Sequence, residues 1–210
     1  MFLEKKKIFL GTAQFLSDYG ATNLNKFKSR KYFFNLLEYA GEKGIFNYDT
    51  ASTYQSEKLI GDFLNTHKIT NAKICTKFHK LGKNYKSKTR EILEKSISNL
   101  KSDIHCLFFH NVNDIKYFRQ DPNFFLNLIK EYSIKKIGFS IYNPIEIKNI
   151  YFNKKICIQI PYNLINIKFQ KLIKLKKYNN IFARSVFFQG ILINKNIKKN
   201  FYINFKKNMK

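Results

Sequence analysis

Short apolar runs alternate with amphipathic helical patterns along most of this chain. Six runs are predicted as strands: 44–50, 72–77, 104–110, 134–142, 156–163 and 181–188. Between them, apolar residues three and four positions apart predict helices over about 29–40, from an N-cap at Ser56, over 87–101, from Asp121, behind 134–142 and over 165–177. The segment KIFLGTAQF, residues 7–15, remains open between a short strand and a hairpin.

The order of these elements predicts an α/β fold. The strand runs do not alternate apolar and polar residues, as expected for strands that are buried on both faces of a parallel sheet. Six repeated units with no linker or low-complexity insert favour a single barrel domain over 1–210, with an open doubly wound sheet as the alternative. The sequence contains no GxGxxG phosphate-binding loop.

Composition and charge limit the function classes. The net charge is +25, but only four of the 39 basic residues are arginines and the lysines are spread along the chain, so we expect no nucleic-acid partner. No apolar run approaches the roughly 18 residues of a membrane span, and the N-terminus lacks a signal-peptide pattern, so we expect a cytoplasmic protein without a membrane partner. The three cysteines lie singly in apolar runs, which predicts buried thiols and no metal site.

Three consecutive predicted strands end in an ionisable side chain, and this is the main functional signal. The first ends at Asp49, the second at Lys77 and the third at His110. In a barrel of parallel strands these ends meet on one face, where barrel enzymes carry their active sites. A lone histidine or aspartate there would be read as a capping or turn residue, but three in succession favour a catalytic site.

The residue types at this face suggest a particular chemistry. Asp49 and Lys77 on neighbouring strands are expected to form an ion pair, and the ammonium group is expected to lower the pKa of Tyr54 in the next loop. A tyrosine tuned in this way can protonate a substrate oxygen, while His110 orients that oxygen. Such a site can reduce a carbonyl group only with hydride from a reduced cofactor.

The same residues lie in motifs that resemble the aldo-keto reductase family. The matching segments are LGTAQF (10–15) with Tyr19-Gly20, DTASTYQSEKLIG (49–61), Thr76-Lys77, FFHN (108–111), IGFSIYNP (137–144), IQIPYN (158–163) and ARSVFFQGIL (183–192). The resemblance implies a (β/α)8-type TIM barrel that reduces aldehydes or ketones with NADPH, or with NADH. It implies a catalytic tetrad of Asp49, Tyr54, Lys77 and His110.

The resemblance also implies where the cofactor binds. Ser140 and Gln159 fall at positions that contact the nicotinamide carboxamide, and Arg184 and Ser185 fall where many members carry a stacking aromatic residue. Arg184 is alternatively expected to contact a cofactor phosphate. Gln55 and Ile141 replace residues that are common in the family, a glycine and an asparagine.

The family pattern continues beyond the last strand predicted here. Two further βα units are expected to be absent, which predicts an incomplete barrel with open edges that offer a route to self-association. The alternative function is therefore a non-catalytic, truncated remnant without a complete cofactor site. Among other polar residues, His79 is read as a surface residue or a pocket residue, His105 as structural, and Glu57 as a partner of the helix dipole.

Overall fold

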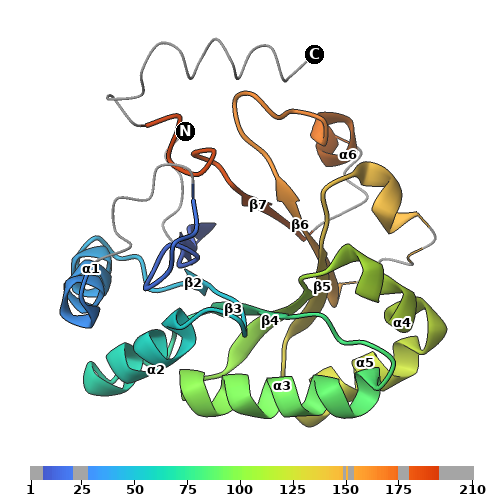
Figure 1. The fold of residues 1–210 in the computed structure, drawn as a ribbon, viewed down its shortest axis with the longest axis horizontal. Helices are drawn as coiled ribbons and strands as arrows, with labels where there is room; N and C mark the ends of the chain where they lie inside the picture. The colour runs from blue at the N-terminus through green and yellow to red at the C-terminus, as the bar shows by residue number, and fades with distance from the viewer. Residues whose placement is uncertain (1–6, 21–27, 149, 151–153, 175–179, 194–210) are drawn as a thin grey trace.

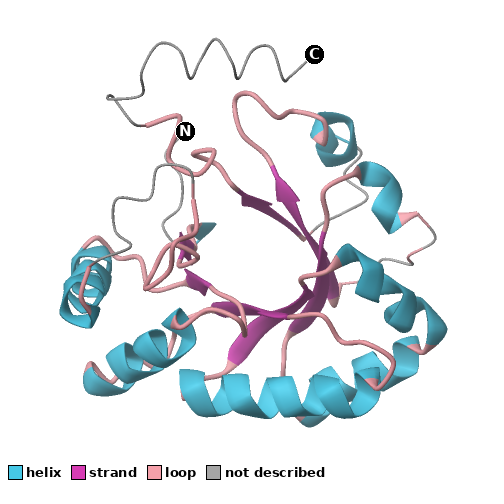
Figure 2. Ribbon diagram, in the orientation of Figure 1, coloured by secondary structure: helices cyan, strands magenta, loops and turns pink. Residues whose placement is uncertain are grey.

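The computed structural model describes residues 7–20, 28–148, 150, 154–174 and 180–193, and it places seven parallel strands in a nearly closed barrel with helices outside (Figures 1 and 2). The sheet order follows the sequence order from β1 to β7. The strands are β1 Leu10–Gly11, β2 Tyr48–Asp49, β3 Ile74–Phe78, β4 Ile104–Phe109, β5 Lys136–Ser140, β6 Ile156–Pro161 and β7 Ile181–Arg184. The predicted incomplete TIM barrel is therefore confirmed.

The segment left open by the sequence provides the first strand. Leu10 and Gly11 pair in parallel with Tyr48 and Asp49, so residues 7–15 begin the barrel and do not form a hairpin. The six apolar runs correspond to β2 to β7, although β2 keeps only two residues of its run. Among the described residues, β1 and β7 are the two edge strands of the sheet.

Helices cover the outer surface of the sheet. The α-helices are α1 Arg30–Glu42, α2 Ser56–Thr66, α3 Tyr85–Leu100, α4 Ile115–Gln120, α5 Pro122–Glu131 and α6 Gln170–Lys174, and the short 3₁₀ helices are η2 Val112–Asp114 and η3 Pro144–Ile147. The Asp121 side chain caps α5 by accepting from the backbone N–H of Phe124, and Pro122 follows it in the first turn. None of the described helices is long and apolar enough to span a membrane.

The prediction that Ser56 is a helix N-cap is wrong. Ser56 is the first helical residue of α2, and the preceding Gln55 makes no side-chain cap. The Ser56 hydroxyl is fully buried and bonds instead to the hydroxyls of Thr12, at 2.9 Å, and Thr50, at 3.0 Å. This hydroxyl chain joins the loops that follow β1 and β2, which are the loops that line the cavity described below.

The core has two parts because each strand presents alternate residues to its two faces. The larger part lies between the sheet and the helices and includes Phe33, Leu37, Phe63, Phe109 and Phe125. The smaller part consists of Cys75, Cys106, Phe108 and Cys157, packed against Phe9 and Phe182. All three cysteines are buried free thiols, as predicted, and burial raises the pKa of the Cys106 thiol.

Gly61 allows close contact between α2 and α3. A Cβ atom at this position would lie 2.0 Å from the backbone oxygen of Asn99 and 2.8 Å from that of Leu100. We expect Gly61→Ala to destabilise the protein by about 1–3 kcal/mol, because the clash is with backbone and outweighs the higher helix propensity of alanine. Urea denaturation measures this, with Lys58→Ala on the exposed face of α2 as the control. Equal stability of the two variants would contradict the close helix contact.

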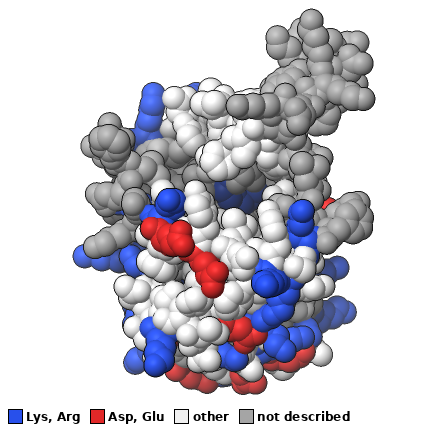
Figure 3. All heavy atoms as spheres, turned by 90° about the vertical axis from the view of Figure 1, so that its left-hand side faces the viewer, with Lys and Arg blue, Asp and Glu red and all other residues white. Residues whose placement is uncertain are grey.

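Surface charges are dispersed on the face that Figure 3 shows, where basic and acidic side chains are interspersed. Asp62 of α2 pairs with both Arg30 of α1 and Lys101 after α3, so some of the basic residues tie neighbouring elements together. On this face, the described side chains form no single basic stripe of the kind that is typical of nucleic-acid-binding proteins.

Candidate active site

Asp49, Lys77 and His110 lie together at the carboxyl ends of the strands. Asp49 ends β2, Lys77 is the penultimate residue of β3, and His110 directly follows β4. The Lys77 ammonium donates to Asp49 Oδ1 at 2.7 Å and to the backbone oxygen of Thr50 at 2.6 Å. The predicted ion pair is therefore present, with the Lys77 side chain 4% exposed and the Asp49 side chain 20% exposed.

Tyr54 lies over this pair. Its ring centroid is 6.0 Å from the Lys77 Nζ atom and 6.1 Å from the His110 ring centroid, with the two rings nearly perpendicular. The loop that carries Tyr54 is held by two backbone bonds, from Tyr54 to the oxygen of Ala51 at 2.8 Å and from Ser52 to the oxygen of Lys77 at 3.1 Å. The structure thus brings the four predicted tetrad residues into one group.

The predicted effect of Lys77 on the pKa of Tyr54 is wrong for the free protein. Burial raises the pKa of the Tyr54 hydroxyl, and the Asp49 carboxylate raises it further. Lys77 is already paired with Asp49 and hydrogen-bonded to the Thr50 carbonyl, so its charge is largely compensated. Tyr54 therefore keeps its proton at neutral pH, as a proton donor requires.

His110 is uncharged at neutral pH. Burial lowers its pKa to about 4, with Lys77 and Arg184 as further causes. A neutral imidazole has one N–H donor and one acceptor nitrogen. His110 can therefore donate a hydrogen bond to a neutral substrate oxygen without bringing a second cation next to Lys77.

The low pKa of His110 predicts a loss of stability in acid. Because its folded pKa, about 4, lies below the ordinary value of 6.5, the contribution of His110 to stability is intact above pH 6.5 and is lost progressively as the pH falls toward 4. We expect the melting temperature, followed by circular dichroism, to fall less over this range in His110→Gln than in the unmodified protein. Parallel pH profiles of the two proteins would contradict the assignment.

Ser140 and Gln159, the two predicted carboxamide contacts, lie side by side. They are paired across β5 and β6, and both side chains are about 2% exposed. The Gln159 Nε2 atom donates to Asp49 Oδ1 at 3.1 Å, whereas its Oε1 atom is buried and has no hydrogen-bond partner among the described residues. A buried acceptor without a partner suits an incoming amide donor, so these residues fit a nicotinamide carboxamide.

Arg184 and Ser185 lie at the end of β7, next to the same site. The guanidinium carbon of Arg184 is 4.3 Å from the centroid of the Tyr142 ring, so the cation stacks on that ring. Its other contacts are long: 3.4 Å to the Ser185 hydroxyl and 3.5 Å to the backbone oxygen of Ile141. The Arg184 Nε atom is buried without a partner in the described part of the chain.

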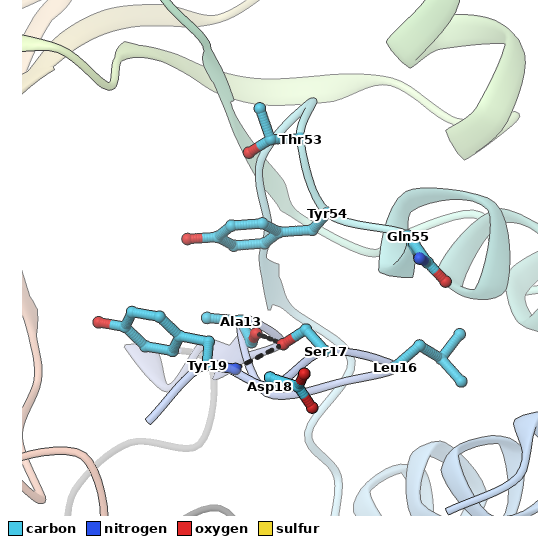
Figure 4. A pocket seen from close by; sticks show the side chains of 8 residues that line it. All are labelled: Ala13, Leu16, Ser17, Asp18, Tyr19, Thr53, Tyr54 and Gln55. Atoms are coloured by element: carbon cyan, nitrogen blue, oxygen red, sulfur yellow. Dashed lines mark hydrogen bonds between the residues drawn. The ribbon is translucent and has the colours of Figure 1, made fainter. Parts of the chain in front are cut away.

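A cavity of about 440 Å³ opens beside Tyr54. It lies between the loops that follow β1 and β2, and its lining residues are Ala13, Leu16, Ser17, Asp18, Tyr19, Thr53, Tyr54 and Gln55 (Figure 4). In Figure 4 the rings of Tyr19 and Tyr54 lie one above the other, and their hydroxyl groups point the same way. The turn that carries Tyr19 is held by its backbone N–H, which donates to the Ser17 hydroxyl at 3.3 Å.

Several supporting residues were missed or only partly explained by the sequence. Glu57 does lie in the first turn of α2, but it is 1% exposed and accepts a 2.6 Å hydrogen bond from Thr76, the residue before Lys77. It therefore ties α2 to β3 in addition to meeting the helix dipole. His79 is half-buried, and its Nδ1 atom lies 3.0 Å from the Ser52 hydroxyl in the Tyr54 loop. Their positions in the sequence could have indicated such roles, because Glu57 lies three residues after Tyr54 and His79 lies two residues after Lys77.

Comparisons with known proteins agree with this arrangement. The family model described as "Aldo/keto reductase family" matches residues 7–210. No curated protein matches the chain significantly.

Among solved structures, a protein from Pseudomonas aeruginosa assigned to the aldo-keto reductases has a TM-score of 0.69 at 22% identity, over 85% of this chain and 73% of its own. An aldo-keto reductase from a deep-sea metagenome library of the Medee basin has a TM-score of 0.63 at 21% identity, over 87% of this chain and 69% of its own. The aldo-keto reductase AKR11C1 from Bacillus halodurans, in its holo form, has a TM-score of 0.67 at 19% identity, over 92% of this chain and 66% of its own. At these identities the structures show a shared fold.

Proposed function

The chain belongs to the aldo/keto reductase family, and from this premise we propose that it reduces an aldehyde or ketone to an alcohol with hydride from NAD(P)H. The family supports an oxidoreductase function in general. The observation that carries the finer proposal is the grouping of Tyr54 with His110 and with the buried Lys77–Asp49 pair. These four groups supply a proton, an oxygen-orienting donor and a fixed positive charge at one place.

In the proposed reaction, Tyr54 is the general acid. The reduced nicotinamide supplies a hydride to the carbonyl carbon when it is bound. Tyr54 gives its hydroxyl proton to the carbonyl oxygen, which becomes the alcohol, and the tyrosine is left as a phenolate. Lys77, held by Asp49, stabilises the negative charge that develops on Tyr54 and the substrate oxygen. His110 donates a hydrogen bond to the same oxygen and thereby fixes the orientation of the carbonyl group.

The residues proposed to hold the cofactor are Ser140, Gln159, Arg184 and Ser185. The orphaned Oε1 atom of Gln159 supports a carboxamide partner at that position. Ser140, opposite Gln159 in the sheet register, is proposed to contact the same amide group. NADPH is the proposed donor, and NADH is the alternative.

The proposal also covers the partners, location and domain organisation of the protein. The proposed partner is a small carbonyl compound, and no nucleic-acid partner is proposed. The proposed location of the protein is the cytoplasm. The chain is proposed as a single barrel domain over residues 1–210. The edge strands β1 and β7 are the proposed route to any self-association, since an edge strand carries backbone groups that can pair with another chain.

Two measurements on the full chain test the function. Titration with NADPH, followed by nicotinamide fluorescence, should show saturable binding, and addition of a panel of aldehydes should then deplete the reduced cofactor. A folded protein that neither binds NADPH nor NADH, and that turns over no aldehyde, would overturn the proposal in favour of a non-catalytic protein.

A further inference from the structure

The first turn of α2 is bonded to both chain segments that determine where the Lys77 ammonium group lies. Glu57 accepts a 2.6 Å hydrogen bond from the hydroxyl of Thr76, the residue before Lys77 in β3. The hydroxyl of the neighbouring Ser56 lies 3.0 Å from that of Thr50, whose backbone oxygen accepts from the Lys77 ammonium group. The base of the lysine side chain and an acceptor at its tip are therefore held by the same helical turn.

The groups that make these bonds are buried. The three hydroxyl groups belong to fully buried residues and Glu57 is 1% exposed, so water does not compete for their hydrogen bonds. Burying a carboxyl group carries a desolvation cost, and an apolar contact could join α2 to β3 without it. The hydrogen bond from Thr76 adds what an apolar contact lacks, a fixed direction and distance at the residue next to Lys77.

The orientation of the Lys77 ammonium group depends on few bonds. It has three N–H donors, and among the described residues two of them meet acceptors, the Asp49 carboxylate and the Thr50 carbonyl. Its Nζ atom lies 6.0 Å from the centroid of the Tyr54 ring. In the proposed reaction this charge stabilises the Tyr54 oxygen, and a misplacement of about 1 Å can cost roughly 100-fold in rate.

We propose that Glu57 is a positioning residue that orients Lys77 through Thr76. The bond to Thr76 holds β3 against α2 at the residue before Lys77, so that the ammonium group lies where negative charge develops on Tyr54. This inference rests on the proposed function and adds to it a residue that acts through another side chain. The alternative is a bond that only joins α2 to β3, in which case its loss would lower stability and leave Lys77 equally ordered in the folded protein.

Proton exchange at the Lys77 ammonium group tests the inference without any turnover. In protein made with isotopically labelled lysine, NMR should show a persistent ammonium signal for the buried Lys77, because exposed lysines exchange their protons rapidly with water; Lys77→Met identifies this signal. We expect Glu57→Ala to accelerate the exchange roughly 10-fold, since one lost hydrogen bond shifts a local opening equilibrium by about that factor. Glu57→Gln keeps an acceptor oxygen and should retain slow exchange.

Steady-state kinetics of the full chain give a second readout. Glu57→Ala should lower kcat roughly 10- to 100-fold and change KM for the aldehyde by less than about twofold, because the misplaced charge acts in the transition state. Glu57→Gln should keep most of the turnover. Ile129→Val, at a buried position of α5, is the control for lost stability and should keep both constants. If Glu57→Ala does not fold, Thr76→Val removes the donor of the same bond and takes its place.

Three results would overturn the inference. The first is slow proton exchange at Lys77 in Glu57→Ala equal to that in the unmodified protein. The second is a Glu57→Gln variant that exchanges as fast as Glu57→Ala. The third is an equal acceleration in Ile129→Val, which would assign the effect to stability alone.

The exchange measurement also separates this inference from the proposed function. If the unmodified protein turns over no aldehyde but Glu57→Ala alone accelerates exchange at Lys77, the reductase function is rejected and the positioning of Lys77 by Glu57 is supported. If the unmodified protein turns over an aldehyde and Glu57→Ala leaves both the exchange and kcat unchanged, the function is supported and the positioning role is rejected.

Discussion

Replacing Tyr54 with phenylalanine is expected to lower the turnover of any aldehyde substrate by roughly 10²- to 10⁴-fold, which is the usual contribution of a general acid. The variant loses the hydroxyl proton but keeps the ring that packs against His110 and over Lys77. Folding and NADPH binding should therefore be unchanged. Steady-state oxidation of NADPH measures the first effect, and thermal melting and fluorescence titration measure the other two.

Tyr39→Phe provides the control for the loss of a tyrosine hydroxyl. Tyr39 lies on α1 and is 57% exposed, away from the site. Turnover by this variant should equal that of the unmodified protein. If Tyr54→Phe also retained full turnover, another group would have to deliver the proton, and the assignment of Tyr54 would be wrong.

Replacing Lys77 with methionine is expected to affect both stability and turnover. The change leaves Asp49 as a largely buried carboxylate whose remaining partner is the amide of Gln159, and breaking a buried ion pair in this way costs about 3 kcal/mol. Turnover should fall at least as far as in Tyr54→Phe, because the charge that stabilises the developing anion is removed as well. Urea denaturation and NADPH oxidation give the two values.

The double variant Asp49→Asn, Lys77→Met separates the two effects. Without the carboxylate, the uncompensated charge disappears, so part of the lost stability should return. Turnover should not return, because the ammonium group is still missing. Recovery of turnover together with stability would show that Lys77 acts only through folding.

The fold was predictable because its signal is local. The run 104–110 has no polar alternation, and this pattern is sufficient to predict β4 as a strand buried on both faces. β1 could not be identified in the same way. Only Leu10 and Gly11 pair with β2, and two residues are too few to show a hydrophobic pattern. Its identity as a strand depends on a partner 38 positions away in the sequence, Tyr48 for Leu10.

The sequence was sufficient to predict that Asp49, Lys77 and His110 lie together at the strand ends, but it did not predict the electrostatics of this group. Strand ends at Asp49 and Lys77 were enough to predict the ion pair. The pKa of Tyr54 was predicted in the wrong direction, because it depends on burial and on the compensation of Lys77 by Asp49. Glu57 was predicted only to interact with the helix dipole, because nothing in the sequence indicates the hydrogen bond from Thr76 of β3 to Glu57 of α2.

Contacts between side chains on different strands depend on the register of the sheet, which cannot be read from any single segment of the sequence. Each cysteine was predicted to be buried, but their meeting inside the barrel depends on the pairing of Cys75 with Cys106 and on the position of Cys157 two strands further on. Arg184 was placed near the cofactor from its motif alone. Its stacking on Tyr142 and its lack of a described counter-ion required the arrangement of β5, β6 and β7.

The central claim is that this barrel transfers a hydride to a carbonyl carbon. It is tested most directly by incubating the protein with NADPH that carries deuterium at the transferable position and with an aldehyde, then examining the alcohol by mass spectrometry. We expect one deuterium atom at the carbinol carbon, and none in the Tyr54→Phe variant over the same time. If the folded protein binds NADPH but no deuterium appears in the alcohol, the claim of hydride transfer is contradicted.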